Sequence, residues 1–229
     1  MDLKQFRLSQ EGLKLIACVS MLIDHIGVAF VHRAALRIIG RLAMPIYCFL
    51  LAEGIRHTKH PVKYGIRLFI GMLLAELPFD YLLSGGIDLH SQSVMLTLFL
   101  AYCMGRCMLR FRSYAAKVLI CIPFTLAAEL LMADYGGHGI MFVALFLFTQ
   151  ELPGKHIART AGLALLCLSM NSAAVYGIPL QLFAVAAMVP IALYSGRKVC
   201  SSTAVQTAFY LFYPGHLAVL WLIRWILRQ

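Results

Sequence analysis

Apolar runs of about 17 to 22 residues recur along the whole chain, and they constrain its fold more than any other feature. An α-helix rises about 1.5 Å per residue, so a run of this length can cross the roughly 30 Å hydrocarbon core of a bilayer. Hydrophobic residues make up 61% of the chain and charged residues only 13%, a composition that excludes an ordinary soluble domain. The sequence therefore predicts an all-α, polytopic, multi-pass protein of the cell membrane.

Hydropathy and turn-forming residues divide the chain into nine expected spans. They lie at residues 13–31, 36–55, 66–83, 93–109, 115–132, 139–151, 158–173, 178–194 and 203–223. The sixth and seventh have the weakest pattern, so we expect about nine transmembrane helices within a range of roughly eight to eleven. No polar stretch is long enough for a separate soluble domain, and residues 1–229 are interpreted as a single transmembrane domain in one bundle.

The basic residues divide unevenly between the two sides that this layout defines. One side carries 15 of the 20 lysines and arginines, and the other carries Arg33, Arg37, Arg41, Arg224 and Arg228. Because positively charged loops remain in the cytoplasm, this asymmetry predicts a cytoplasmic N-terminus and an outward C-terminus. It also explains most of the net charge of +10, so we expect these charges to meet a lipid bilayer and not a nucleic acid.

The seven cysteines lie in or at the ends of apolar segments, without CxxC pairs or histidines at metal-ligand spacing. We therefore expect neither a disulfide nor a metal site. Cys103 and Cys107 repeat small residues four positions apart, a pattern that favours a close helix contact and is compatible with a homodimer.

Several ionisable residues lie near the depth of the bilayer centre. Asp24 and His25 lie about 17 Å along the first span, and Asp80 and His216 lie about 20 Å along the third and the ninth. An unpaired charge at this depth costs at least about 2.5 to 3.5 kcal/mol, so these side chains are expected to converge on an interior polar site. The expected site consists of Asp24, His25, Arg41, Glu76, Asp80 and His216.

The partners of Asp24 and His25 should come from other helices, because adjacent helical residues point about 100° apart. Arg41 is a natural partner for the Asp24 carboxylate, while Asp80 or Glu76 is a candidate to hold the His25 ring. A purely structural interpretation is also open, in which pairs such as Asp24–Arg41 and Glu76–His216 only hold helices together.

A basic loop follows Glu53 at the inner end of the second span. It carries Arg56, His57, Lys59, Lys63 and Arg67. One interpretation is a topology signal that also attracts anionic lipid. Another is a docking surface for a phosphorylated cytoplasmic molecule, and the two are compatible.

Short fragments spread over most of the chain carry a family resemblance. They are Leu13–Ala17, Leu22–Gly27, Leu36–Pro45, Ala52–Gly54, His57–Thr58, Glu76–Asp80, Asp134–Gly136, Tyr194–Arg197 and Tyr210–His216. In this combination the chain resembles the TraX family, whose founding member is the membrane acetylase of conjugative F-pilin. One departure is Ser93 before Val94, where relatives often have asparagine; if that asparagine contacts the acceptor, the acceptor of this chain differs.

The family is similar to a wider group of transmembrane acyltransferases that pass an acetyl group from cytoplasmic acetyl-CoA to an acceptor across the membrane. The resemblance implies that Asp24, His25, Arg41 and Glu53 belong to the active region and that acetyl-CoA is the donor. The acceptor stays open between a peptide N-terminus, an amino sugar and a glycan hydroxyl, that is, a peptide or a glycan.

Such a transfer needs a base for the attacking amine or hydroxyl and donors for the oxyanion. His25 suits the base role with His216 as its rival, and Arg41 either holds Asp24 or faces the oxyanion. The donor's nucleotide would lie at the basic loop while its pantetheine reaches the middle of the membrane.

Two other functional classes compete with the acyltransferase. A proton-coupled small-molecule transporter would also use intramembrane carboxylates and histidines, although the chain lacks recognisable inverted halves. A noncatalytic assembly protein would explain the apolar bulk but not the converging ionisable layer.

Overall fold

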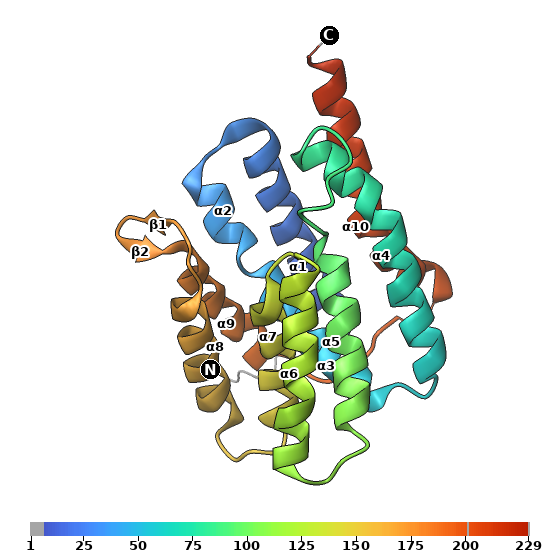
Figure 1. The fold of residues 1–229 in the computed structure, drawn as a ribbon, viewed down its shortest axis with the longest axis vertical. Helices are drawn as coiled ribbons and strands as arrows, with labels where there is room; N and C mark the ends of the chain where they lie inside the picture. The colour runs from blue at the N-terminus through green and yellow to red at the C-terminus, as the bar shows by residue number, and fades with distance from the viewer. Residues whose placement is uncertain (1–6, 201, 229) are drawn as a thin grey trace.

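Helices form most of the chain in the computed structural model, which describes residues 7–200 and 202–228 (Figure 1). The α-helices are α1 (Gln10–Ile26), α2 (Ala34–Gly40), α3 (Ala43–His57), α4 (Pro61–Leu83), α5 (Val94–Met108), α6 (Tyr114–Leu130), α7 (Gly136–Phe148), α8 (Lys155–Ser169), α9 (Met188–Ala192) and α10 (Thr203–Ile226). The π-helix η2 (Gly27–Val31) continues α1, and the 3-10 helix η3 (Leu180–Ala187) leads into α9. Strands β1 (Ala174–Val175) and β2 (Ile178–Pro179) form an antiparallel hairpin that projects from one side of the bundle.

Each of the nine expected spans coincides with one helix or with two consecutive helical segments. Three segments are long and apolar enough to cross a membrane, namely Gln10–Val31, Ala34–His57 and Thr203–Ile226. The apolar α5 and α7 have 15 and 13 residues, so they extend only about 20 Å and fall short of a core of roughly 30 Å. The helical fold is confirmed and its apolar helices indicate a membrane location, but the structure does not establish nine spans.

Local sequence signals explain where the first and fourth helices begin. Ser9 caps α1, because its Oγ accepts a hydrogen bond of 3.1 Å from the backbone N–H of Gly12. Pro61 opens α4, where the missing proline N–H removes no helical hydrogen bond and the fixed φ suits the first turn.

Two of the long segments are interrupted close to the residues of the expected polar site. The α1 segment widens into η2 directly after Ile26 and ends at His32, whose φ of 50° is left-handed. Arg41 and Leu42 form a turn between α2 and α3, so the expected second span is two helices instead of one. Short π-helical segments such as η2 occur frequently at functional sites.

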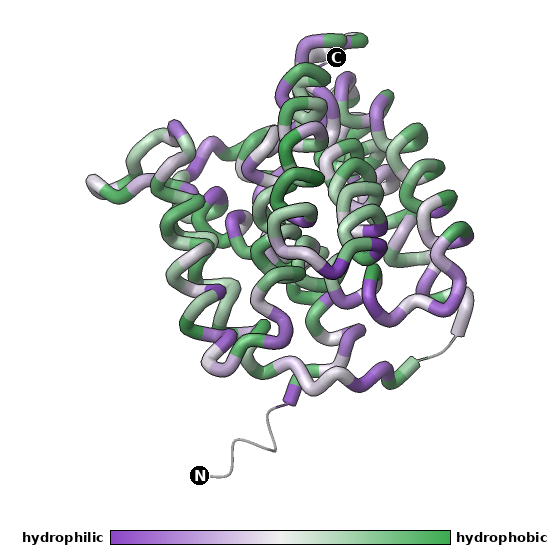
Figure 2. The backbone as a smooth tube through the Cα atoms, turned by 60° about the horizontal axis from the view of Figure 1, so that its bottom comes forward, coloured by the Kyte–Doolittle hydropathy of each residue, from purple (hydrophilic) through white to green (hydrophobic). Residues whose placement is uncertain are grey.

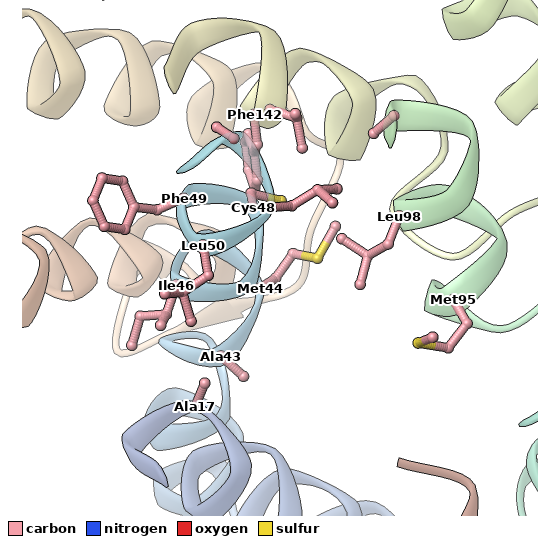
Figure 3. Close-up of a cluster of buried hydrophobic side chains, with 14 of the residues drawn as sticks. Ala17, Ala43, Met44, Ile46, Cys48, Phe49, Leu50, Met95, Leu98 and Phe142 are labelled. Carbon is pink, nitrogen blue, oxygen red and sulfur yellow. The ribbon is translucent and has the colours of Figure 1, made fainter. Parts of the chain in front are cut away.

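The core is built around α3, whose side chains are buried on several faces (Figure 3). Ile46 and Cys48 are fully enclosed, and Phe49 packs edge-on against Phe146 of α7 at a ring-centroid distance of 5.5 Å. Ala17 of α1 and Leu98 of α5 belong to the same cluster. This packing holds α1, α5 and α7 against one central helix.

Apolar side chains also cover much of the outside of the bundle. On α4 they include Phe69, Ile70, Leu73, Leu74 and Leu77, which are all exposed. Figure 2 shows hydrophobic residues along the helices and hydrophilic residues concentrated in loops and at helix ends. In water such a surface would be unfavourable, whereas contact with lipid tails satisfies it.

Two packing arrangements bring distant parts of the chain together. Helix α10 lies beside α4 and also contacts α1 (Figure 1). The start of α1 is tied to the segment after α9, since the Gln10 N–H donates to the Arg197 carbonyl at 2.9 Å and Leu8 bridges Tyr194. The N-terminal ends of α1 and α10 therefore flank one end of the bundle.

Candidate functional site

Asp24 on α1 lies between two guanidinium groups. Its carboxylate accepts hydrogen bonds from Arg41 at 2.8 and 3.0 Å and from Arg37 on α2 at 2.8 Å. Arg41 is buried and also donates to the Tyr135 hydroxyl at 3.1 Å. The expected Asp24–Arg41 pair is present. The further hydrogen bonds from Arg37 to Asp24 and from Arg41 to Tyr135 compensate for burying two charges that would be costly without partners.

Two glycines allow α2 to approach α1 closely enough for this pairing. A Cβ built on Gly40 would collide with the Asp24 side chain, and one built on Gly27 would lie 2.8 Å from Leu36 Cβ. Real Cβ atoms essentially never approach a neighbour this closely. Both positions therefore require glycine for the helices to pack as they do.

His25 lies next to Asp24 but pairs with another helix. Its Nδ1 is 2.8 Å from Nε2 of His216 on α10, and His216 Nδ1 is 2.7 Å from the Phe212 carbonyl oxygen. Tyr213 packs edge-on against both imidazole rings, with centroid distances of 6.2 and 5.6 Å. The expectation that Asp24 and His25 take partners from different helices is confirmed.

The predicted pairing of His25 with Asp80 or Glu76 is wrong, and so is the Glu76–His216 pair. Both Glu76 oxygens accept the Ser93 N–H, at 3.0 and 3.1 Å, and Asp80 accepts the Asp88 N–H at 3.2 Å. These two carboxylates satisfy the backbone of the loop between α4 and α5. Backbone N–H groups away from water need acceptors, and the two α4 carboxylates are the acceptors for this loop.

Asp88 is itself an acceptor within this loop. The N–H of His90 and the hydroxyl of Ser84 donate to its carboxylate at 2.8 and 3.0 Å and hold the pKa of that carboxyl below its usual value. Glu76, Asp80 and Asp88 therefore serve the architecture of one loop.

A cavity of about 750 Å³ opens between α1, α3, α4, α5 and α10. Its wall contains four cationic side chains, five tyrosines and an apolar stretch. The cations are Lys14, Lys63, Arg67 and Lys198; the tyrosines are Tyr47, Tyr64, Tyr194, Tyr210 and Tyr213; the apolar stretch includes Met21, Leu50, Leu68, Val94, Met95 and Leu98. Tyr213, at one edge of the cavity wall, packs against His25 and His216, but the two histidines, Asp24 and Arg41 are not themselves part of that wall.

The residues expected at the donor side divide into two groups. Glu53, His57, Lys63 and Arg67 line the cavity, whereas Arg56 and Lys59 are not part of its wall. Arg56 instead forms an ion pair of 2.6 Å with the exposed Glu151 after α7. This hydrogen bond lowers the pKa of the Glu151 carboxyl, and it directs Arg56 away from the cavity.

Glu53 contributes a negative group to the same cavity. Its Oε1 accepts a hydrogen bond of 2.5 Å from the Gln150 amide, and its Oε2 is 3.8 Å from His57 Nε2. Glu53 therefore contacts side chains at the ends of α3 and α7. Its carboxylate can accept a hydrogen bond or balance a positive charge at the cavity wall.

Sequence reasoning missed several residues of this region. The sequence could have indicated Arg37 as a second partner of Asp24, because Arg37 precedes Arg41 by four residues and residues four apart on a helix share a face. Lys198 and Tyr213 offered no such signal, because only the packing of distant segments brings them to the cavity.

The family model described as "TraX protein" matches residues 9–224. A probable fimbrial assembly protein FimC (serogroup H1) of Dichelobacter nodosus is 29% identical over 226 residues, which cover 91% of this chain and 92% of the relative. An uncharacterized protein of Rickettsia prowazekii (strain Madrid E) is 49% identical over 64 residues, covering 27% of this chain and 26% of the relative. No solved structure matches significantly.

Proposed function

Because this chain belongs to the TraX family, we propose that it is an integral-membrane acetyltransferase that uses cytoplasmic acetyl-CoA. The acceptor would be an amine or hydroxyl presented at the outer side of the membrane. The observation that carries the proposal is the cavity, because its wall includes both a cationic region and Tyr213, whose ring packs against His25 and His216. The fimbrial assembly name of the Dichelobacter relative favours a pilin-like peptide over a glycan as the acceptor.

The cavity suits a long phosphorylated thioester. Its volume of about 750 Å³ is within the range of roughly 300 to 1,000 Å³ for small-molecule sites. Lys14, Lys63, Arg67 and Lys198 can hold phosphate oxygens through charge-assisted hydrogen bonds. The apolar stretch toward Met21 and Tyr213 can accept the uncharged pantetheine arm, which would carry the acetyl group to the histidines.

The chemistry needs one proton acceptor near the thioester. The attacking nitrogen or oxygen forms a bond to the acetyl carbon, the carbon–sulfur bond breaks, and the proton of the nucleophile passes to an imidazole. That proton then reaches the coenzyme A thiolate and gives the free thiol. His25 and His216 are the candidate bases, and Arg41 or the Tyr213 hydroxyl is a candidate donor to the oxyanion.

The experiment compares cavity cations with a nearby cation outside the cavity. Lys63→Gln with Arg67→Gln should weaken acetyl-CoA binding at least about tenfold, because two phosphate contacts are lost. Arg56→Gln is the matched control, since Arg56 lies in the same basic region but bonds to Glu151. Binding is measured with labelled acetyl-CoA on the full chain in nanodiscs, and transfer is measured to a pilin-like peptide.

Equal loss in the two variants would reduce the cationic region to a general electrostatic effect. If the wild-type protein neither binds acetyl-CoA nor transfers acetyl groups, the proposal is wrong. Proton-coupled flux in proteoliposomes would then support the transporter.

A further inference from the structure

The hydrogen bonds of the histidine pair have a direction that the heavy-atom positions reveal. A backbone carbonyl can only accept, so the 2.7 Å contact with Phe212 requires a proton on His216 Nδ1. In a neutral imidazole the other nitrogen then carries a lone pair, which places the acceptor of the pair on His216 Nε2.

The lone pair on His216 Nε2 determines which nitrogen of His25 carries the proton. Since His216 Nε2 accepts, the 2.8 Å contact requires that His25 Nδ1 carries the proton and donates it. The lone pair of neutral His25 therefore resides on Nε2, for which no hydrogen bond is found within residues 7–200 and 202–228. His216 has both ring nitrogens engaged, whereas His25 has one.

We propose that His216 is a positioning residue that fixes the tautomer of His25 and leaves His25 Nε2 as the base of the transfer. This inference rests on the proposed acetyl transfer and decides between the two candidate bases. In a catalytic triad a carboxylate accepts the Nδ1–H of the histidine base and fixes its tautomer; here His216 does the same for His25 as a neutral acceptor. The carboxylates of the expected polar site have other partners: Asp24 pairs with arginines, and Glu76 and Asp80 accept loop N–H groups.

The local packing keeps the His216 ring in this orientation. Its ring stacks on Phe212 at a centroid distance of 4.9 Å and an interplanar angle of 18°, while Tyr213 meets it edge-on. The ring is therefore held by two aromatic neighbours as well as by two hydrogen bonds.

The proton balance of the relay follows from these contacts. His25 Nε2 takes the proton of the attacking amine or hydroxyl and becomes an imidazolium. The positive charge stays on His25, whose Nδ1–H still donates to His216 Nε2, and the Phe212 carbonyl holds the His216 ring so that Nε2 remains the acceptor. His25 Nε2 then gives the proton to the coenzyme A thiolate, which leaves as the thiol and restores the neutral pair.

The first test is spectroscopic and does not depend on activity. Solid-state NMR of the full chain with ¹⁵N-labelled histidine in bilayers, at a pH where both rings are neutral, should show protonated Nδ1 and unprotonated Nε2 for both residues. Loss of the respective signals in His25→Gln and His216→Gln assigns them. A proton on Nε2 of neutral His25 would contradict the proposed direction of the hydrogen bond and overturn the inference.

The second test separates a positioning residue from a base by conservative replacement. The side-chain oxygen of glutamine can accept the His25 Nδ1–H, whereas alanine cannot. His216→Ala should lower kcat about 10- to 100-fold with the acetyl-CoA KM nearly unchanged, as expected for one lost buried hydrogen bond, and His216→Gln should recover most of that loss. His25→Ala and His25→Gln should both lower transfer by about 10² to 10⁴.

Leu211→Ala on the exposed side of α10 is the control for a general effect on this helix. If His216→Gln is as inactive as His25→Ala while His25→Gln retains activity, His216 is the base and the inference is wrong. If the wild-type chain transfers no acetyl group, the proposed function fails, and the NMR assignment still decides the direction of the pair.

Discussion

Asp24 illustrates how single residues determine whether a charge is tolerated inside this bundle. Its carboxylate is bound by two arginines, and Gly40 leaves the space that its side chain occupies. The same arrangement prevents Asp24 from reaching the His25 ring, which points to α10. The two adjacent residues therefore have separate roles, one in holding α1 to α2 and one in the candidate reaction.

Replacing Gly40 by alanine should destabilise the protein by about 1 to 3 kcal/mol, because the added Cβ collides with Asp24 and forces the helices apart. Thermal unfolding in detergent measures the effect. Gly215→Ala on α10 is the control, since a Cβ there meets nothing within 4 Å. Equal stability of the two variants would contradict this account of α1 and α2 packing.

Asp24→Asn should be more severe, with a loss of about 3 to 5 kcal/mol, because Arg41 is left buried without its countercharge. Arg37→Gln should cost less, since the Arg37 side chain is 32% exposed and can contact water or lipid headgroups. The comparison uses unfolding midpoints of the two variants in one detergent. A larger loss for Arg37→Gln would reverse the order that burial predicts.

At the scale of elements, hydrogen bonds to carboxylates in the last turns of α4 hold the loop between α4 and α5. Glu76 accepts the N–H of Ser93, which occupies the N-cap position of α5, and Asp80 accepts the N–H of Asp88. Gln92 also pairs with the segment before α7, through hydrogen bonds of 3.0 Å to Met132 and 2.9 Å from Asp134. The start of α5 is thus fixed from two sides, and Val94 and Met95 keep their places in the cavity wall.

Glu76→Ala should release this loop, because it removes both acceptors of the Ser93 N–H and leaves a buried donor unpaired at a cost of about 1 to 3 kcal/mol. Hydrogen exchange should speed up across residues 84–95 and remain unchanged in α7. Leu77→Ala, the next residue on α4 with an exposed side chain, is the control. Unaltered exchange at residues 84–95 would show that Glu76 does not hold the loop.

At the scale of the whole molecule, the cationic part of the cavity wall lies near the start of α4, and the loop between α4 and α5 follows its end. This helix has 23 residues and is about 35 Å long, which exceeds a hydrocarbon core of roughly 30 Å, although it is not among the three segments that are both long and apolar enough to cross a membrane. Lys63 near its start lines the cavity, and Asp88 follows its end. The uneven distribution of basic residues predicts that the cavity side is cytoplasmic.

Cysteine labelling can test this orientation. On a background without the seven native cysteines, Lys59→Cys should react from the cytoplasm and Asp88→Cys from the outside, with impermeant maleimide applied to intact cells and to inverted vesicles. Labelling of both positions from the same side would refute the predicted topology. The reverse pattern would leave the helix arrangement intact but place the cavity outside.

The sequence by itself determined where helices form, because lipid offers no partner for backbone polar groups and each apolar run must satisfy its own hydrogen bonds. It also indicated the Asp24–Arg41 pair, since the two residues lie on consecutive spans and a buried charge requires a countercharge. It could not indicate that His25 meets His216, 191 positions away, or that Glu76 and Asp80 serve a loop. Only the tertiary structure decided these contacts and the wall of the cavity, because they depend on how each helix is rotated and where it bends, and hydropathy records neither.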